Sequence, residues 1–583
     1  MPLMRPISWT AAYLMRYMIN KKQSIIPGFS LTLGITITML SIFILIPLAS
    51  VLVFSLHQSP GQFFECISDK SVLNALITSV SCAFGAALVN CVFGLILAWV
   101  LVRCTFPGKR ILDGLIELPF ALPTAVAGIT LSKMYATTGE IGGPLSKLGI
   151  TVSYTHLGIL VAMVFIGIPF VVRTVQPVLE KFNPSYEEAA YVLGAGSFLT
   201  FRRVILPELR PALLTGFGLA FARGLGEYGS VIYISGNSAK NKTQVVSYVI
   251  MQKLNYLDYT SATSIALLML IISFLLLLFV NAMAVYQAKR TGTDYEVAQI
   301  SNISARQGAR ERGMIVLAIL FVFFMLILPL FSVLRNALAK GFDFYMACLQ
   351  TDYVGSALGV TVMATVLALA VNTFFGLVAA WALTRFSFRG KQVLGALIDI
   401  PFSVSPVIAG LAYIMTFGRL GWAWPILEKF NDVFGTDVQI VFALPGVVLA
   451  TIFVTFPFVS RELIPVLNSV GNGEEEAAAM MGASGFTIFR RITFPHIKWP
   501  LIYGMILCGA RALGEFGAVS ALSKTRGETF TLPLEIDALY MDGGADSITA
   551  AFAVSSILVI LAVVVLILRN IFEYRAKAGQ TKN

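Results

Sequence analysis

Twelve long apolar segments restrict this 583-residue chain to one broad kind of fold. A helix needs roughly 20 mostly apolar residues to cross the hydrocarbon core of a bilayer. Six such segments stand on each side of a polar stretch from Gln287 to Gly313. They lie near residues 30–56, 73–101, 113–135, 157–175, 212–235 and 261–286, and near 314–336, 355–383, 394–417, 440–460, 501–522 and 548–569. The pattern predicts an all-α integral membrane protein with twelve transmembrane helices.

The composition excludes a soluble protein of this length. Only 13% of the residues are charged and 57% are hydrophobic, whereas a soluble domain carries about 25% charged residues. The six cysteines form no C-x-x-C pair, and the three histidines are too few to suggest a metal cluster. We therefore expect no metal site. No arrangement of a nucleophile with a base points to an enzyme either.

The distribution of Lys and Arg predicts which loops face the cytoplasm. With the N-terminus inside, the inner segments carry roughly 27 Lys and Arg and the outer segments roughly 12, as the positive-inside rule requires. Topology thus explains the net charge of +11, and no nucleic-acid partner is inferred. Both termini are predicted to be cytoplasmic, with residues 1–29 as a basic cytoplasmic or interfacial leader and residues 570–583 as a tail.

The two halves of the chain repeat each other. Matched residues 282 positions apart include Arg103 and Arg385, Pro119 and Pro401, Phe120 and Phe402, and Gly128 and Gly410. After an insertion of six residues, those 288 apart include Arg173 and Arg461, Glu188 and Glu476, and Arg223 and Arg511. We predict two six-helix repeats, at residues 30–286 and 314–569, joined by a cytoplasmic linker at 287–313. Because both repeats start inside, they are parallel, with a pseudo-two-fold axis along the membrane normal.

A polar loop between the fourth and fifth predicted spans of each half has the most specific pattern. Each loop contains Glu-Ala-Ala, three residues, a glycine, nine residues and a four-residue run that ends in proline. These residues are Glu188, Ala189, Ala190, Gly194 and Pro207 in the first loop, and Glu476, Ala477, Ala478, Gly482 and Pro495 in the second. The spacing predicts two short helices joined at a glycine corner.

The loop pattern resembles the EAA motif of permease subunits of bacterial ABC importers. The resemblance implies the type I importer permease fold, with coupling helices that dock on two copies of a cytosolic ATPase. Glu188 and Glu476 would then carry motion from ATP hydrolysis into the spans. The chain itself has no G-x-x-x-x-G-K-[ST] phosphate loop. We therefore expect this chain to bind no cofactor, with ATP and Mg²⁺ held by the separate ATPase.

Other segments resemble the permeases of sulfate/thiosulfate importers. Residues 117–128 (ELPFALPTAVAG) and 221–230 (FARGLGEYGS) look like the T-type permease, and residues 510–519 (ARALGEFGAV) and 526–534 (RGETFTLPL) look like the W-type permease. A fusion of the two implies sulfate or thiosulfate cargo, a periplasmic binding protein, a bacterial inner membrane and alternating access. Molybdate or tungstate and iron(III) remain alternative cargoes, and an ion-gradient-driven secondary transporter remains an alternative class.

Two arginines within the predicted fifth spans mark a translocation pathway or a gate. Arg223 and Arg511 fall about halfway along these spans, where a charge costs roughly 2.5–3.5 kcal/mol. Each is followed four residues later by a glutamate, Glu227 or Glu515. The arginines either attract a divalent oxyanion or form salt bridges that fix the helix interface, and the sequence leaves both interpretations open.

Prolines within the predicted third spans indicate kinks. Pro119, Pro123, Pro401 and Pro406 interrupt these spans, and each removes a backbone hydrogen bond. The freed backbone groups and the hydroxyls of Thr124, Ser403 and Ser405 are candidates for lining the pathway, with packing alone as the other explanation. Cys66 and Cys348 occupy matched positions in the first outer loops, and a periplasmic location would permit a disulfide between them.

Overall fold

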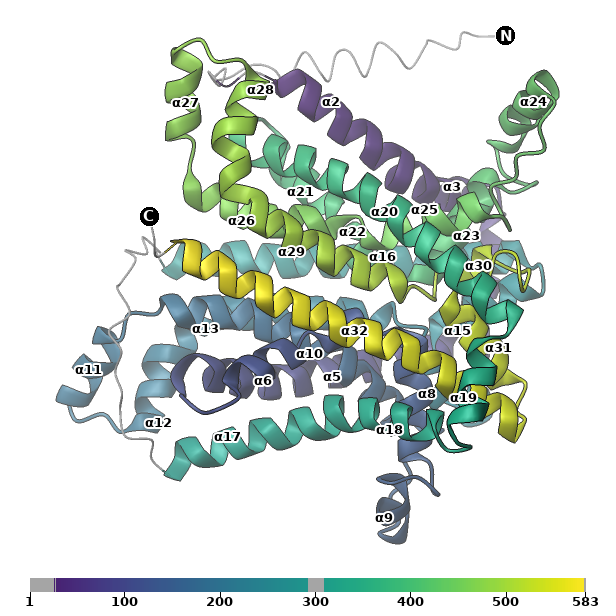
Figure 1. The fold of residues 1–583 in the computed structure, drawn as a ribbon, viewed down its shortest axis with the longest axis horizontal. Helices are drawn as coiled ribbons and strands as arrows, with labels where there is room; N and C mark the ends of the chain where they lie inside the picture. The colour runs from purple at the N-terminus through teal and green to yellow at the C-terminus, as the bar shows by residue number, and fades with distance from the viewer. Residues whose placement is uncertain (1–25, 27, 292–308, 581–583) are drawn as a thin grey trace.

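The computed structural model describes Ile26, residues 28–291 and residues 309–580. Most of the predicted leader and much of the predicted linker lie outside these residues. Within them all regular elements are helical, which agrees with the predicted all-α class. Figure 1 shows two groups of helices packed side by side, with the long α32 running across the front between them.

The elements of the first half follow one another in this order, with η marking π-helical segments: α2 (Phe29–Leu40), η1 (Ser41–Leu45), α3 (Ile46–Leu56), α4 (Pro60–Ser68), α5 (Lys70–Arg103), α6 (Lys109–Leu115), α7 (Leu118–Ala121), α8 (Thr124–Tyr135), α9 (Gly142–Lys147), α10 (His156–Lys181), α11 (Ser185–Val192), α12 (Ser197–Thr200), η2 (Phe201–Ile205), α13 (Leu206–Leu225), α14 (Val231–Ile234), α15 (Val246–Asn255) and α16 (Tyr259–Thr291).

The second half repeats this order: α17 (Ala309–Val322), η3 (Phe323–Ile327), α18 (Leu328–Ala337), α19 (Phe342–Leu349), α20 (Asp352–Arg385), α21 (Lys391–Ile398), α22 (Ile400–Ser403), α23 (Pro406–Phe417), α24 (Trp424–Phe434), α25 (Leu444–Thr455), α26 (Pro457–Val470), α27 (Gly473–Met480), α28 (Gly485–Ile488), η4 (Phe489–Thr493), α29 (Phe494–Leu513), α30 (Val519–Leu522), α31 (Leu532–Met541) and α32 (Ala545–Gln580). Even the π-helical segments recur, because η3 follows η1 by 282 residues and η4 follows η2 by 288.

The number of single spanning helices is smaller than the twelve predicted. Within the described ranges, nine helices are long and apolar enough to cross a membrane, or ten if one bent pair is counted. The bent pair joins residues 109–121 to Thr124–Tyr135 at 106°, so the kink predicted at Pro123 is confirmed. The predicted span at 394–417 is divided in the same way, since α22 ends at Ser403 and α23 begins at Pro406.

The fifth spans also differ from the prediction. The first was expected at 212–235, but α13 ends at Leu225, and α29 in the second half ends at Leu513. Arg223 and Arg511 therefore lie near helix ends, and the expectation that they fall halfway along a span was wrong. The helices extend further at other predicted boundaries: α16 continues to Thr291, and α32 continues to Gln580 through the predicted tail.

The first span of each half packs against the other half. The α2 helix contacts α20, and α3 contacts α23, whereas α17 contacts α5 and α18 contacts α8. Polar contacts also join each first span to the other half. The Tyr413 hydroxyl donates to the Phe43 carbonyl at 2.7 Å, and Arg335 pairs with Glu140 at 3.1 Å. The two halves are thereby interlocked across their shared face.

Close helix packing at matched positions explains two of the glycines. A Cβ on Gly94 of α5 would lie 2.7 Å from Val171 Cγ1 of α10, and one on Gly376 of α20 would lie 2.6 Å from Val459 Cβ of α26. Because lipid supplies no hydrophobic drive between helices, membrane helices associate through such close contacts of small residues. The second and fourth spans of each half therefore form a tight pair.

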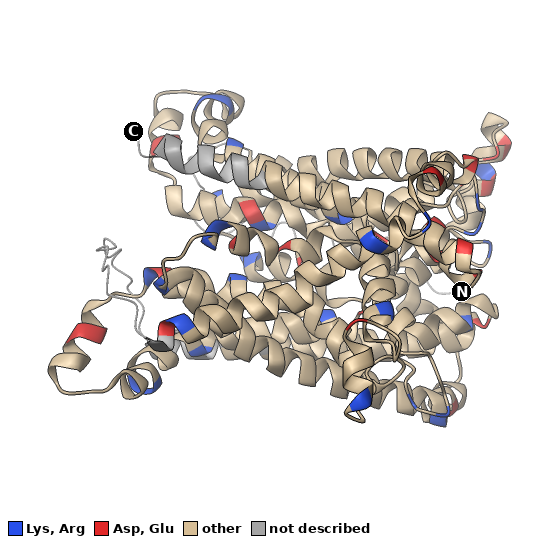
Figure 2. Cartoon of the chain, turned by 60° about the horizontal axis from the view of Figure 1, so that its bottom comes forward, with Lys and Arg blue, Asp and Glu red and all other residues tan. Residues whose placement is uncertain are grey.

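Different short helices project from the two ends of the molecule. The short helices α11 and α27 lie well apart at one end, near the C-terminal end of α32, and α24 projects at the other end (Figure 1). Figure 2 shows that the outer surfaces of the long helices are mostly uncharged, and that charged residues gather toward the two ends. An uncharged band between two charged ends is what a lipid bilayer requires.

Candidate translocation pathway and coupling loops

Four phenylalanines form a ring where the two halves meet. The centroid of the Phe120 ring lies 5.1 Å from that of Phe170 and 6.4 Å from that of Phe458. The Phe402 ring closes the circle, at 5.2 Å from Phe458 and 6.4 Å from Phe170. Phe120 and Phe402 are repeat partners, as are Phe170 and Phe458, so each half supplies the same two side chains.

The phenylalanine ring borders a small cavity of about 30 Å³. Its other walls include Pro119, Pro401, Thr124, Pro406, Arg223 and Arg511. A space of this size holds a water molecule but no bulky hydrated anion. The aromatic ring thus leaves little open space where the two halves meet, and two arginines lie beside it.

Each of these arginines is paired with the glutamate that follows it. Arg223 Nη1 lies 2.6 Å from Glu227 Oε2, and Arg511 Nη2 lies 2.6 Å from Glu515 Oε2. The glutamates are 2% and 1% exposed. They lie in the turns after the helices, where Glu227 accepts from the Ser230 amide at 2.9 Å and Glu515 from the Ala518 amide at 2.9 Å. The structure therefore contains the two salt bridges of the second interpretation.

Glycines at the ends of α13 and α29 bring the backbones of the two halves together. A Cβ on Gly226 would lie 3.1 Å from Ser405 Cα in the other half, and one on Gly514 would lie 3.0 Å from Pro123 Cα. Each fifth helix therefore ends against the break in the opposite third span. This contact depends on tertiary structure, so the apolar pattern of residues 226–235 could not reveal the helix end.

The remaining pathway candidates separate into two groups. Pro119, Thr124 and Pro406 border the central cavity, and Pro123 lies behind it against Gly514. Ser403 and Ser405 are not among the residues that line this cavity. The Ser403 hydroxyl donates to the Ile400 carbonyl at 2.9 Å, and the Ser405 hydroxyl bonds with that of Ser247 at 3.0 Å. A role for the two serines in a pathway therefore stays a prediction.

Two further arginines, whose functional setting the sequence did not reveal, lie one helical turn from the ring toward the coupling loops. Arg173 of α10 pairs with Asp113 at 2.8 Å and with Glu117 at 2.6 Å. Its repeat partner Arg461 pairs with Asp399 at 3.0 Å, and its guanidinium carbon lies 4.4 Å from the centroid of Phe402. The Tyr503 hydroxyl of the second half donates to Glu117 at 3.1 Å. These residues tie the ring to the helices that lead into the loops.

Each EAA-like loop folds as the predicted pair of helices with a glycine corner. In the first loop α11 and α12 flank Gly194, whose φ is +79°, and in the second loop α27 and α28 flank Gly482, whose φ is +84°. Only glycine adopts this left-handed conformation without strain. Pro207 and Pro495 follow at the second positions of α13 and α29, directly after the π-helical segments η2 and η4.

Most motif residues of the loops face outward. Glu188, Ala189 and Ala477 are exposed and Glu476 is half-buried, whereas Ala190 and Ala478 are buried and pack the helices against the body. Large apolar side chains surround them on the outer face. The most exposed of these are Val192, Leu193, Phe198, Met480, Met481 and Phe486. Exposed apolar groups gathered beside free carboxylates are typical of a surface that another protein covers.

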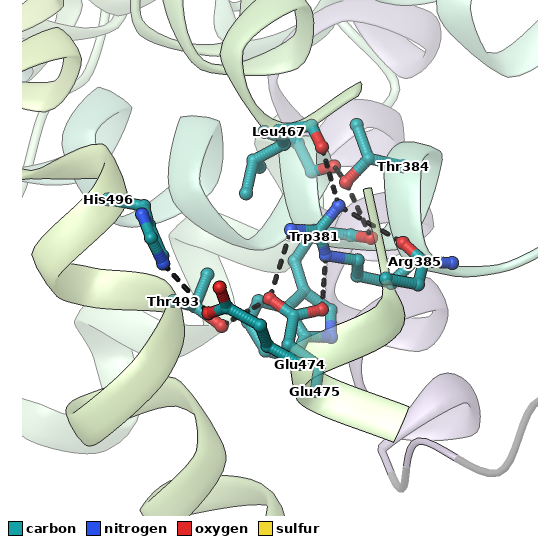
Figure 3. Close-up of polar contacts among 10 residues, drawn as sticks. Trp381, Thr384, Arg385, Leu467, Glu474, Glu475, Thr493 and His496 are labelled. Carbon is teal, nitrogen blue, oxygen red and sulfur yellow. Dashed lines mark hydrogen bonds and ion pairs between the residues drawn. The ribbon is translucent and has the colours of Figure 1, made fainter. Parts of the chain in front are cut away.

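The glutamate before each EAA triplet has a different role, which the sequence did not reveal. Glu187 pairs with Arg103 at 2.5 Å, and Glu475 pairs with Arg385 at 2.5 Å (Figure 3). Burial raises the pKa of the Glu187 carboxyl, and the charge of Arg103 offsets part of this rise. Each pair fastens a loop helix to the end of the second span. The signal was present in the repeat, where Arg103 and Arg385 are matched.

The six cysteines, all of which lie in the described ranges, are free thiols. The Cys66 thiol of α4 lies 3.8 Å from the Ser261 carbonyl, to which it donates. Burial raises the pKa of both the Cys66 and the Cys348 thiols. The structure therefore gives no support to a disulfide between them. Among the described residues, no group of His, Cys, Asp and Glu side chains is arranged to hold a metal ion.

Comparison with known protein families identifies the class. The family described as "Binding-protein-dependent transport system inner membrane component" matches the chain twice, at residues 90–293 and 372–578. The two matches together cover more than half of the chain, so the chain belongs to this family. It is therefore a multi-pass membrane component of a transport system and not an enzyme.

Relatives at 41–48% identity are permeases named for sulfate. The sulfate transport system permease protein CysT of Escherichia coli is 48% identical over 259 residues, which are 44% of this chain and 93% of the relative. The CysT protein of Salmonella typhimurium is 47% identical over the same length and coverage. The CysW protein of Escherichia coli is 41% identical over 282 residues, which are 48% of this chain and 94% of the relative. The chain thus resembles a fusion of both permease types, as predicted.

Proposed function

We propose that this chain is the complete transmembrane permease of an ATP-driven sulfate or thiosulfate importer. The observation that carries the proposal is the pair of family matches, together with relatives of two sulfate permease types that each span about half of the chain. One chain would then supply the whole pathway as two parallel repeats of six spans each. The third spans would cross as broken helices, and α29 would be the fifth span of the second repeat.

The proposed partners follow from the two ends of the molecule. Two copies of a cytosolic ATPase, which bind ATP and Mg²⁺, would dock on α11 and α27 through Glu188, Glu476 and the exposed apolar side chains around them. Both termini would then be cytoplasmic, and the chain would lie in a bacterial inner membrane. A periplasmic sulfate- or thiosulfate-binding protein would dock at the opposite end, where α24 projects.

The proposed mechanism is alternating access. ATP binding would draw α11 and α27 together, and the helices that follow them, α13 and α29, would carry this motion to Arg223 and Arg511. The passage would open outward and receive cargo from the binding protein, and hydrolysis would return it to the inward-facing state. Binding within the passage should be weak, because tight binding would hinder release.

Growth of a bacterial strain that lacks its own sulfate permeases tests this function. The strain, given this chain with its ATPase and binding protein, is expected to grow with sulfate as its source of sulfur. Growth should fail when the ATPase gene is omitted. Equal growth without the ATPase would contradict the proposal and favour a gradient-driven transporter, and uptake of molybdate or iron(III) without sulfate would change the cargo.

Truncating two side chains of the phenylalanine ring is expected to let sulfate leak through the protein. In a Phe120→Ala, Phe402→Ala variant, the aromatic closure loses one side chain from each half, and water enters a constriction that excludes ions by its apolar lining. Sulfate should then cross proteoliposome membranes without ATP, at least about tenfold faster than with the unmodified protein. Phe374→Ala on the exposed surface of α20 is the control. A double variant that stays as tight as this control would show that the ring is not the barrier.

A further inference from the structure

The two coupling loops are fastened to the spans with different strength. In the second half, the Arg385 side chain is 1% exposed and that of Glu475 is 3% exposed. The guanidinium meets the carboxylate through two atoms, with Nε at 2.5 Å from Oε2 and Nη2 at 2.9 Å from Oε1. In the first half, Arg103 and Glu187 are 23% and 18% exposed and meet through Nη2 and Oε1 alone. The second fastening is thus the more buried, and its guanidinium contacts both carboxylate oxygens, with Nη2–Oε1 as the hydrogen bond and Nε–Oε2 as an ion-pair contact.

The second fastening also reaches more helices (Figure 3). Arg385 ends α20, and its Nη1 donates to the Leu467 carbonyl of α26 at 2.7 Å and to Asn472 Oδ1 at 3.2 Å. The Thr493 hydroxyl, at the end of η4 just before α29, donates to Glu475 Oε1 at 2.6 Å. One carboxylate and one guanidinium therefore join α27 to the cytoplasmic ends of α20, α26 and α29.

The first half cannot form the same network. Ile205 and Pro184 occupy the positions of Thr493 and Asn472, and neither has a polar side chain. Arg103 borders a cavity of about 480 Å³ instead, and its guanidinium lies 5.9 Å from the centroids of both Trp99 and Phe182. Pro184, which directly precedes α11, also lines this cavity, so the first coupling helix begins beside open space and lacks the polar contacts that hold the second.

We propose that Arg385, Glu475 and Thr493 are positioning residues that make the second coupling helix a rigid lever, while the first coupling helix is compliant. A displacement of α27 by its ATPase would move the ends of α20, α26 and α29 as one body. A displacement of α11 would be partly absorbed before it reached α5 and α13. The inference rests on the proposed function, and it means that the two ATPase contacts contribute unequally to transport.

A buried ion pair resists separation because breaking it leaves a charge without a partner and away from water, whereas a partly exposed pair separates at little cost. Matched substitutions in the two loops use this difference. Glu475→Gln and Glu187→Gln remove the same charge from equivalent positions and keep the side-chain shape. The measurement is the number of sulfate ions imported per ATP hydrolysed, in proteoliposomes that contain this chain, its ATPase and the binding protein.

We expect Glu475→Gln to lower this ratio about tenfold while ATP hydrolysis stays within about twofold of the unmodified complex. Glu187→Gln should lower the ratio by no more than about twofold. A residue that only stabilised the fold would lower hydrolysis and uptake together and leave the ratio unchanged. Equal effects of the two substitutions, or an unchanged ratio in Glu475→Gln, would overturn the inference.

A second variant decides the outcome if Glu475→Gln does not fold. Thr493→Val keeps the ion pair and removes only the hydroxyl that joins Glu475 to α29, and it should lower the ratio about threefold. If the unmodified complex couples ATP hydrolysis to sulfate import and Thr493→Val leaves the ratio unchanged, the inference is overturned. If the unmodified complex imported sulfate without consuming ATP, the proposed function itself would fail, which separates the two claims.

Discussion

Replacing both Glu188 and Glu476 with lysine is expected to reduce ATP-dependent uptake at least about a hundredfold, because the two charge reversals together weaken ATPase docking by several kcal/mol. Both carboxylates lie on the outer side of their helices, one exposed and the other half-buried. A lysine at a docking site turns attraction into like-charge contact, which costs several kcal/mol at a protein interface. Because neither side chain supports the core, the variant should fold normally.

The control for this double variant is Glu65→Lys. Glu65 is exposed on α4, which is neither a coupling helix nor α24, so the substitution makes the same charge reversal away from both proposed docking sites. Two quantities are measured for both variants: the amount of ATPase that copurifies with the chain, and ATP-dependent sulfate uptake. An intact ATPase complex and normal uptake in the Glu188→Lys, Glu476→Lys variant would contradict the proposed docking role.

The second large effect concerns stability. Arg511→Met is expected to lower the free energy of unfolding by about 3–5 kcal/mol. The substitution leaves Glu515, which is 1% exposed, without the arginine that its Oε2 contacts. Its other oxygen already accepts from the Ala518 amide, so the carboxylate cannot easily turn to a new partner. Thermal unfolding of the detergent-solubilised protein measures the loss.

A paired substitution separates the salt bridge from any contact with cargo. In Arg511→Met, Glu515→Gln the buried charge is gone together with its partner, and most of the lost stability should return. Equal stability of the single variant and the unmodified protein would contradict the prediction. Uptake by the stable paired variant then addresses the alternative that the sequence left open, because normal uptake would confine Arg511 to a structural role.

The repeat and the motifs predicted much of the local structure. Gly194 and Gly482 are left-handed at the corners where the spacing placed them, and the bend between residues 109–121 and Thr124–Tyr135 falls at a predicted proline. These features depend on backbone chemistry within a few residues, which a sequence records directly. The ends of α13 and α29 depend instead on Ser405 and Pro123 of the opposite half, and only a tertiary structure brings these residues together.

The roles of several site residues could not be predicted from the sequence for the same reason. Glu187 and Glu188 are neighbours of the same type, and only the orientation of α11 toward the end of α5 determines which of them meets Arg103. Phe120 and Phe402 were recognised as repeat partners, but apolar spans contain many phenylalanines that face lipid. Their role as a ring became visible only when Phe170 and Phe458 lay beside them.

The central claim is that this chain alone forms the membrane pathway of an ATP-driven sulfate importer. Its most direct test is the uptake of radiolabelled sulfate by proteoliposomes that contain this chain, its ATPase and the binding protein. We predict uptake that requires ATP, competes with thiosulfate and disappears in the Glu188→Lys, Glu476→Lys variant. Uptake that continues without ATP or without the ATPase would contradict the account.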